Sequence, residues 1–179
     1  MKFRLSALIP LLIFSFIGLA LAIGLRNDPR AMPSTMIDRD MPAFTLQAVS
    51  DDLPLLQHSD LLGKISLLNV FGSWCTACLH EHPTLMRLSR QNRIAIYGVD
   101  WRDTPSAGAN WLRVNGNPYA AVGLDSQSHL AIDLGVTGAP ETYLIDPKGR
   151  IRFKQIGPIT EQVWRDTIEP MVRLLEAEQ

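Results

Sequence analysis

The chain has 179 residues, 46% of them hydrophobic, and its 17 basic and 18 acidic side chains leave a formal net charge of −1. This length suits one domain with a sizeable core once a targeting segment is set aside. The balanced charge supplies no basic surface for a polyanion, so we expect no nucleic-acid partner. Only two cysteines are present, which excludes a scaffold held together by disulfides.

The N-terminal part holds an apolar, uncharged stretch over residues 5–25 with basic residues on both sides. About 20 such residues cross a bilayer core, so we predict a transmembrane anchor here and a cytoplasmic tail over residues 1–4. The alternative is a cleaved signal peptide, because Ala20-Leu21-Ala22 is similar to a cleavage site. The apolar region of a signal peptide usually has about 7–15 residues, which favours the anchor.

A linker and one folded domain are predicted after this stretch. Residues 26–40 contain two prolines and charges of both signs without periodicity, which is typical of a linker. The domain is assigned to residues 41–179. A long domain after a short tail crosses the membrane largely regardless of its charge, so we expect it to face an oxidising compartment.

Around the cysteines, the pattern predicts a strand, a turn and a helix in succession. Residues 65–71 are a nearly continuous apolar run with β-branched side chains, which indicates a strand buried on both faces. A helix is predicted over 75–91, and Pro83 inside it is expected to produce a kink. Residues 94–99 predict a second buried strand, so the three elements form a right-handed βαβ unit.

The later part of the chain alternates between helix and strand. We predict short helices over 106–115 and 128–134 with a strand between them, a hairpin with strands over 142–146 and 151–155, and a closing helix with apolar side chains from 163 to 175. Turn residues at 147–150 join the hairpin strands, and Thr160 is the predicted N-cap of the closing helix. This order predicts an α/β fold with a mixed central sheet and helices on both faces.

The chemistry is expected at Cys75 and Cys78. Cys75 follows the carboxyl end of the first strand at the first turn of the helix, where unpaired N–H groups and the positive end of the helix dipole favour an anion. Such a position lowers the pKa of a cysteine thiol from about 8.5 to roughly 3.5–7.5. We predict that Cys75 is the exposed nucleophile that attacks a substrate disulfide, and that Cys78 resolves the mixed disulfide. A bridge between them closes too small a ring to add much stability.

The pair is also compatible with two core cysteines or with part of a metal site. Cys75, Cys78 and His82 share a helical spacing, but a tetrahedral site lacks a clear fourth ligand, so we predict no metal. His80 is expected to be exposed, and His82 to lie on the helix surface or partly covered. No organic cofactor is expected, because the dithiol itself carries two electrons. A chaperone that handles metal or haem through the two cysteines is the alternative from another class.

Two segments of the sequence resemble the thioredoxin fold. FGSWCTACLHEHPTL at 71–85, with a strand before it and a proline five positions after the second cysteine, is similar to the active-site segment of that fold. GVTGAPETYLID at 135–146 is similar to the loop whose proline is cis and lies against the active-site disulfide. The resemblance implies a thioredoxin-like fold with Pro140 in this cis-proline loop, and an ordinary turn proline is the alternative.

More narrowly, the chain resembles the thiol:disulfide interchange proteins of bacterial cytochrome c maturation over nearly its whole length. The shared features are Gly-Ala-Pro-Glu-Thr at 138–142, Gly-Asn-Pro-Tyr-Ala at 116–120, Glu-His after the helix start, and the N-terminal anchor. This resemblance implies a single-pass protein of the bacterial inner membrane whose catalytic domain faces the periplasm. It also implies a membrane thiol reductase as electron donor, and apocytochrome c or a thiol protein of the same maturation system as acceptor. The alternative is a general periplasmic thiol reductase or oxidase.

That family has two acidic residues near the active site that are associated with its specificity, and Glu81 and Glu141 match them. A carboxylate near Cys75 raises the energy of the thiolate and opposes the helix dipole, which makes the cysteine a weaker acid. Either glutamate is alternatively a solvated surface charge.

Further residues around the pair are candidates for tuning and partner binding. Trp74 is expected to shield the disulfide and to offer a flat contact surface, with simple packing as the alternative. Thr76 and Ala77 stand between the cysteines, where relatives commonly have a proline and where redox poise is tuned, so the direction of electron flow stays open. Ala139, next to Pro140, is assigned to partner binding.

Overall fold

The structure is a computed structural model that describes residues 8–24 and 36–178. Four sequence predictions fall wholly or partly outside these ranges. They are the cytoplasmic tail over 1–4, both ends of the anchor, residues 26–35 of the linker, and the last residue of the domain assigned to 41–179.

The chain divides into two compact units, Met1–Pro33 and Ser34–Gln179. The first contains helix α1 (Leu8–Gly24), whose large apolar side chains are exposed, with Phe14 at 78%. Among the residues that the structure describes, no helix combines the length and the apolar character needed to cross a membrane. The anchor over 5–25 therefore stays a prediction.

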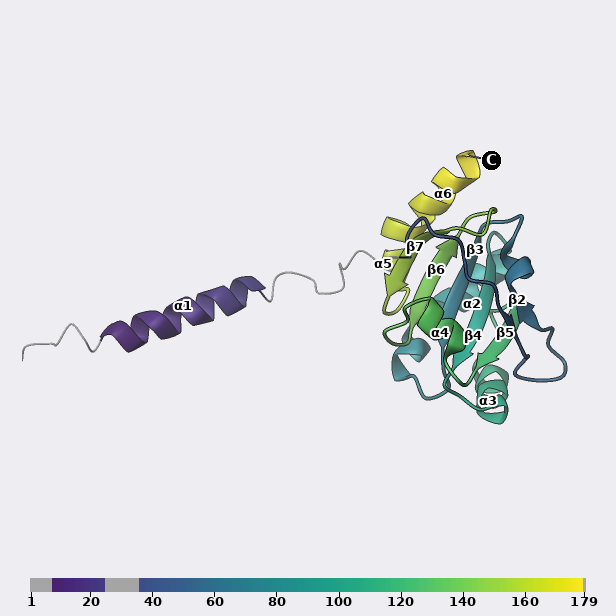
Figure 1. Cartoon of the computed structure of the whole chain (residues 1–179), viewed down its shortest axis with the longest axis horizontal. Helices are drawn as coiled ribbons and strands as arrows, with labels where there is room; N and C mark the ends of the chain where they lie inside the picture. Colours follow the sequence, from purple (N-terminus) through teal and green to yellow (C-terminus); the bar gives the residue numbers. More distant parts are fainter. Residues whose placement is uncertain (1–7, 25–35, 179) are drawn as a thin grey trace, which may run out of the picture. The chain divides into compact units, whose positions relative to one another are not determined.

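The second unit is built on a five-stranded sheet with the strand order β5-β4-β3-β6-β7 (Figure 1). Its strands are β3 (Ser66–Phe71), β4 (Ala95–Trp101), β5 (Ala121–Asp125), β6 (Glu141–Ile145) and β7 (Ile151–Ile156). β3, β4 and β5 run parallel, whereas β6 is antiparallel to both β3 and β7. The predicted mixed sheet is confirmed, and all six residues of its central strand β3 are buried.

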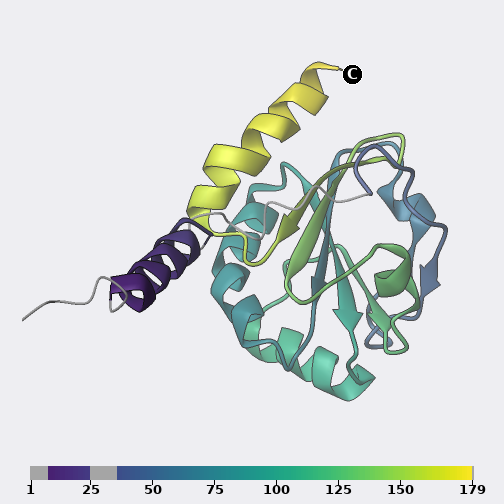
Figure 2. The same ribbon diagram turned by 60° about the vertical axis from the view of Figure 1, so that its left-hand side comes forward.

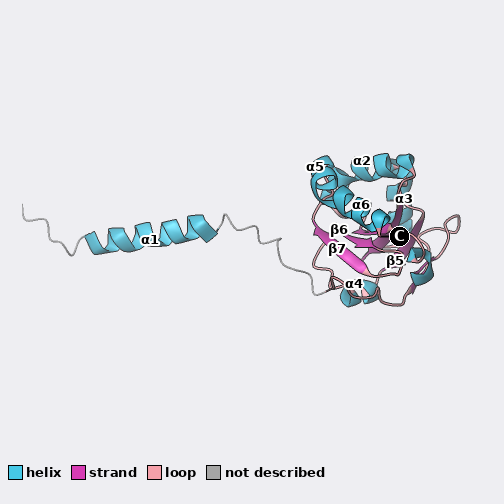
Figure 3. Cartoon of the chain, turned by 90° about the horizontal axis from the view of Figure 1, so that it is seen from above, coloured by secondary structure: helices cyan, strands magenta, loops and turns pink. Residues whose placement is uncertain are grey.

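Helices cover both faces of this sheet, as predicted. They are α2 (Thr76–Gln91), α3 (Pro105–Asn115), α4 (His129–Asp133), α5 (Glu161–Val163), the π-helical turn η3 (Trp164–Ile168) and α6 (Glu169–Ala177). α4 lies on the opposite face of the sheet from α2 and α3 (Figure 2), and α5 and α6 share the α2 face (Figure 3). Because side chains alternate along a strand, Leu67 and Phe71 of β3 face the α2 layer, while Leu68 and Val70 face the α4 layer.

A two-stranded ribbon that the sequence analysis did not predict packs beside β5. β1 (Thr45–Leu46) pairs antiparallel with β2 (Leu56–Gln57), and the short 3-10 helix η2 (His58–Leu61) follows. Gly123 of β5 makes room for the ribbon, since a Cβ there would lie 2.5 Å from Leu46 Cβ. Each ribbon strand has only two residues, so no alternation of apolar and polar side chains marks it in the sequence.

The turn and cap predicted near the C-terminus are confirmed. In the β6–β7 turn, Lys148 N donates to Asp146 Oδ1 at 2.9 Å, and Thr160 Oγ1 accepts from Val163 N at 3.1 Å as the N-cap of α5. The closing helix differs from the prediction because η3 widens its middle into a π-helical turn. α2 runs as one uninterrupted helix through Pro83.

Candidate active site

The two cysteines lie where β3 ends and α2 begins. Cys75 is the N-cap of α2, so the helix starts one residue later than predicted. The Cys75–Cys78 disulfide has an S–S distance of 2.12 Å and a Cα–Cα distance of 5.3 Å. Cys75 Sγ also accepts a hydrogen bond from Cys78 N at 3.1 Å. A sulfur atom thus takes the place that a serine or aspartate oxygen fills at most helix N-termini.

Cys75 is more enclosed than the sequence analysis predicts. It is 4% exposed and Cys78 is 1% exposed, so the prediction of an exposed nucleophile is wrong for the disulfide form. The reason is packing, because both cysteines belong to the apolar cluster on the α2 face of the sheet, and Ala139 packs against the same cluster.

Trp74 is the large exposed side chain beside the pair, with 51% of its surface accessible. Its Nε1 donates to Trp101 O at 3.0 Å, and the two indole rings meet edge to face with centroids 5.8 Å apart. Gly72 permits this conformation, since a Cβ there would lie 2.5 Å from Trp74 Nε1. Thr76 and Ala77 are exposed next to it. Trp74 is therefore not a core side chain, and it offers an apolar ring to solvent beside the disulfide.

The loop before β6 carries the other residues that the resemblance singles out. The Ala139–Pro140 peptide bond is cis, in the loop for which the resemblance implies this geometry. Pro140 is buried and its carbonyl oxygen accepts from Gly157 N at 2.9 Å. Ala139 is half-buried against the cluster that contains both cysteines, so this loop and the disulfide share one apolar environment.

Glu81 is a buried carboxyl, one helical turn after Cys78, with an exposure of 1%. Its Oε1 accepts from Asn69 Nδ2 at 2.8 Å and its Oε2 accepts from Ile159 N at 2.9 Å. Asn69 lies on the central strand β3, where it also donates to Thr142 Oγ1 at 2.9 Å and accepts from Tyr119 Oη at 2.7 Å. The interpretation of Glu81 as a surface charge is therefore wrong.

The buried position gives this carboxyl unusual acid–base behaviour. Burial raises the pKa of Glu81 to about 7, although the hydrogen bonds from Ile159 and Asn69 act in the opposite direction. Burial also raises the pKa of Tyr119 well above its usual value, with further contributions from Glu81 and Asp100. A carboxyl that titrates near neutral pH can both accept and return a proton, which is what a general acid–base group needs.

Glu141 is buried as well, but its charge is paired. Its Oε2 lies 2.9 Å from Lys154 Nζ, and its Oε1 accepts from Thr137 N at 2.9 Å and from the Thr137 hydroxyl. Lys154 Nζ also donates to Gly135 O at 2.7 Å. This ion pair ties the loop that carries Pro140 to strand β7, so Glu141 is not a surface charge either.

His82 is held inside the domain. It is 5% exposed, its Nε2 lies 3.1 Å from Asn115 O, and its ring meets Trp111 edge to face at 4.6 Å between centroids. Burial lowers the pKa of His82. His80 is exposed, as predicted. Within residues 8–24 and 36–178, no group of three or more histidine, cysteine, aspartate or glutamate side chains is arranged to hold a metal ion.

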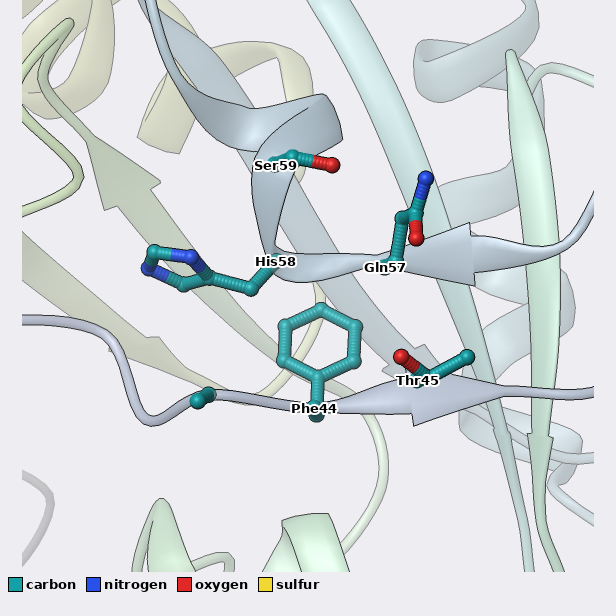
Figure 4. Close-up of a pocket in the computed structure, with 6 residues that line it drawn as sticks. Phe44, Thr45, Gln57, His58 and Ser59 are labelled. Carbon is teal, nitrogen blue, oxygen red and sulfur yellow. The ribbon is translucent and has the colours of Figure 1, made fainter.

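A separate pocket lies on the β1–β2 ribbon (Figure 4). Its lining residues are Ala43, Phe44, Thr45, Gln57, His58 and Ser59. None of these lining residues belongs to the site that the sequence predicts.

Comparison with known proteins agrees with the fold and the cysteine pair. The sequence matches the Redoxin family over residues 37–170. The thiol:disulfide interchange protein DsbE of Pseudomonas aeruginosa is 43% identical over 96% of this chain and 95% of its own length. The DsbE of Escherichia coli K12 is 40% identical over 94% of both chains. The structure of a secreted thiol-disulfide isomerase from Corynebacterium glutamicum superposes with a TM-score of 0.65 at 21% identity, and the match covers 82% of this chain and 96% of that one.

The thioredoxin-like fold, the cysteine pair at a helix N-terminus and these matches define a thiol-disulfide oxidoreductase. Its redox-active group is the Cys75–Cys78 disulfide. The chain belongs to the Redoxin family and, within it, to the thiol:disulfide interchange proteins.

Sequence reasoning missed several polar residues that organise the site. Asn69 is the one polar side chain inside the apolar run of β3 after Ser66, and Asp100 directly follows the apolar run of β4. A polar side chain in a strand that is expected to be buried needs a partner, because an unpaired polar group there is costly. The polar residue in or directly after each apolar run was therefore the signal that could have found them. Tyr119 and Lys154 gave no comparable signal, because their partners are distant in the sequence.

Glu81→Gln is expected to remove a pH dependence of stability. The pKa of Glu81 is about 7 in the folded chain against 4.5 as its ordinary value, so its stabilising contribution is complete below about pH 4.5 and is lost as the pH rises through about 7. At about 1.4 kcal/mol per pKa unit, the loss is about 3 kcal/mol. Between about pH 4 and about pH 9, the free energy of unfolding of Glu81→Gln should therefore gain about 3 kcal/mol relative to the parent.

Denaturant unfolding of the disulfide form across that pH range measures this difference. Glu178→Gln, which removes an exposed carboxyl, is the matched control and should follow the parent. If the difference in the free energy of unfolding between Glu81→Gln and the parent did not change with pH, the raised pKa of Glu81 would be contradicted.

Proposed function

We propose that this thiol-disulfide oxidoreductase is a reductant of the bacterial periplasm that serves cytochrome c maturation. The observation that carries the proposal is the disulfide at the N-terminus of α2 with the buried, titrating carboxyl of Glu81 one turn after Cys78. The names of the relatives support disulfide exchange, and the motifs shared with the cytochrome c maturation family support the narrower role. Electrons come from a membrane thiol reductase and pass to apocytochrome c or to a thiol protein of the same system.

Cys75 is the nucleophile in this proposal. The Cys78 N–H that points at Cys75 Sγ stabilises a thiolate more strongly than a neutral thiol, and the N-terminus of α2 adds its positive dipole end. The thiolate attacks one sulfur of the client disulfide, forms a mixed disulfide and releases the other client sulfur as a thiolate.

Cys78 completes the exchange. It loses its proton and attacks Cys75 Sγ, which releases the second client sulfur and restores the Cys75–Cys78 disulfide. Two electrons have then passed to the client, whose sulfur atoms take up protons. We assign Glu81 as the acceptor of the Cys78 proton, because residues three apart share a helix face and its pKa of about 7 suits this task.

The surface around the pair is assigned to the client. Trp74, Thr76 and Ala77 are exposed there, and Ala139 and the cis Pro140 stand in the loop packed on the same cluster. An apolar ring and a short loop suit an extended peptide that carries a disulfide.

Glu141 has a different part from the one that the resemblance implies. Its carboxylate is paired with Lys154 and bonded to Thr137, so its charge is largely compensated locally. We assign it to holding the Pro140 loop, which leaves Glu81 as the acidic residue that tunes the cysteines.

The proposal also places the chain in the inner membrane. Residues 5–25 are the anchor, 1–4 the cytoplasmic tail, 26–40 the linker, and 41–179 the periplasmic domain. α1 lies inside the proposed anchor, and the exposure of its apolar side chains, such as Phe14, supports a surrounding of lipid.

A general periplasmic thiol reductase or oxidase is the second candidate. The observation that favours it is the dipeptide Thr76-Ala77, which lacks the proline common in relatives. A metal-handling or haem-handling chaperone is less well supported, because the Nε2 atom of His82 is engaged with Asn115 O.

Cys75→Ser is expected to abolish disulfide exchange, since it removes the nucleophile. Cys78→Ser is expected to accumulate mixed disulfides with the client, since the resolving thiol is lost. Non-reducing gels of the reduced variants incubated with a client disulfide distinguish the two results. The double variant Cys75→Ser/Cys78→Ser controls for folding, and full activity of either single variant would sink the mechanism.

Loss of the gene product is expected to lower holocytochrome c, and an added small-molecule thiol should restore it. Haem staining of membrane fractions measures the level, with cells that carry only the Cys75→Ser chain as the matched comparison. Normal holocytochrome c without the protein would remove the cytochrome c role and leave the exchange chemistry in place.

A further inference from the structure

A second buried acid lies at the carboxyl end of β4. Asp100 is 0% exposed, and neither of its oxygens receives a hydrogen bond from the residues that the structure describes. Gly108 of α3 leaves the space for it, because a Cβ there would lie 1.9 Å from Asp100 Oδ2. A buried ionised carboxyl without donors is costly, so this position favours the protonated acid.

The next acid along the chain, Asp103, is hydrogen-bonded to the turn that precedes Cys75. Asp103 Oδ2 accepts from Ser73 N at 2.6 Å, and its Oδ1 accepts from Thr104 N at 2.8 Å. Ser73 stands two residues before Cys75, in the turn that joins β3 to α2. Because Trp74 Nε1 also donates to Trp101 O, two hydrogen bonds fix this turn, one to the last residue of β4 and one to Asp103 in the segment after it.

The segment after β4 has a strained backbone. Arg102 has a φ of 54° and therefore lies in the left-handed region, which is unfavourable for a residue with a side chain. Surrounding contacts must hold such a conformation. Arg102 N donates to Asp125 O at 3.2 Å, and Asp103, the next residue, is held by Ser73 N and Thr104 N.

The two carboxyls act on each other in opposite directions: Asp103 disfavours the ionised form of Asp100, whereas Asp100 favours the ionised form of Asp103. Burial, and next the negative charge of Asp103, raise the pKa of Asp100 to about 8. For Asp103, burial acts to raise the pKa, but the hydrogen bonds from Ser73 and Thr104 and the neighbouring Asp100 hold it below its usual value. A protonated Asp100 can donate its O–H to Asp103, which ionised carboxyls cannot do for each other.

The other groups around Asp100 do not compensate its charge. Tyr119, from the segment before β5, titrates far above neutral pH, partly because of Asp100 itself. α3 presents Gly108, and β3 presents Phe71 as the register partner of Asp100. Asp103 is therefore the charged group to which Asp100 responds among the described residues.

We propose that Asp100 and Asp103 are positioning residues that share one proton, and that this proton holds the Cys75 turn in place through the bond from Ser73. When the proton leaves, two like charges face each other, and Asp103 releases Ser73. The turn that carries Trp74 and Cys75 then loses the bond to Asp103 and keeps the bond to Trp101 at the end of β4. The inference rests on the proposed nucleophilic role of Cys75, and it predicts that exchange slows at alkaline pH.

Asp100→Asn is the variant that tests the pair. Its amide can donate to Asp103 at every pH. The bond between Ser73 N and Asp103 should therefore persist at the alkaline pH at which the parent loses it. The rate of glutathione-disulfide reduction by the reduced full chain in detergent is compared between the two proteins. The titration of the cysteines cancels in the ratio of variant to parent. This ratio should rise by about threefold to about tenfold between about pH 7 and about pH 9, because a group with a pKa of about 8 loses most of its protons there.

The amide resonance of Ser73 gives a readout that does not depend on activity. In the parent, the Ser73 resonance should shift with pH with a midpoint near 8. In Asp100→Asn it should not shift in that range. In Asp103→Asn the midpoint, which reports the pKa of Asp100, should move down because the neighbouring charge is gone. Asp133→Asn, which removes an exposed carboxyl on α4, should match the parent in both measurements.

Identical Ser73 titrations in the parent and Asp100→Asn would overturn the proposal. A rate ratio that stays within about twofold across this pH range would overturn it as well. A parent that performs no exchange, but whose Ser73 amide titrates as expected, would remove the role of Cys75 and leave the carboxyl pair.

Discussion

The constraint on which the structure depends is the junction between a fully buried parallel strand and the helix that follows it. β3 has no solvent-facing side, so the turn after it must deliver the chain directly into α2. Cys75 occupies that junction and caps the helix with its sulfur atom. The same position supplies backbone N–H groups and the helix dipole to a thiolate, which is the environment that the proposed nucleophile needs. Trp74 reaches solvent beside it because Gly72 lets the indole fold back onto Trp101.

Two buried acids of the domain favour the protonated form. Glu81 and Asp100 are both buried, and burial raises the pKa of each into the range around neutral pH. Glu141 shows the other way to keep a carboxylate inside, with a lysine partner and donors from Thr137. These arrangements have different consequences. A carboxylate with a cationic partner stays ionised and stabilises the fold, whereas a buried carboxyl without a cationic partner can exchange a proton near neutral pH. Disulfide exchange moves protons together with electrons, and Glu81, an acid of the second kind, stands one helical turn after Cys78.

Much of the fold could be predicted because its signals are local. The apolar run of β3, the turn residues between β6 and β7 and the cap at Thr160 each lie within a few residues of the element they define. The site was predicted through its cysteines and the Pro140 loop, since both carry short motifs. Other features depend on residues that the sheet order brings together. They are the burial of Cys75, the hydrogen bonds of Asn69, the ion pair of Lys154, and the bond between Ser73 N and Asp103. Nothing in the spacing of those residues along the chain shows this, and the two-residue strands of the β1–β2 ribbon are too short to carry a pattern.

The reduction potential of the Cys75–Cys78 pair in the full chain tests the central claim most directly. Equilibration against thiol-disulfide buffers, with alkylation of the free thiols, gives the value. A reductant that depends on a dedicated electron donor should lie well below about −180 mV, toward the roughly −270 mV of thioredoxin. A value near −120 mV would identify an oxidant and contradict the proposed direction of electron flow, while the fold and the two cysteines would stand.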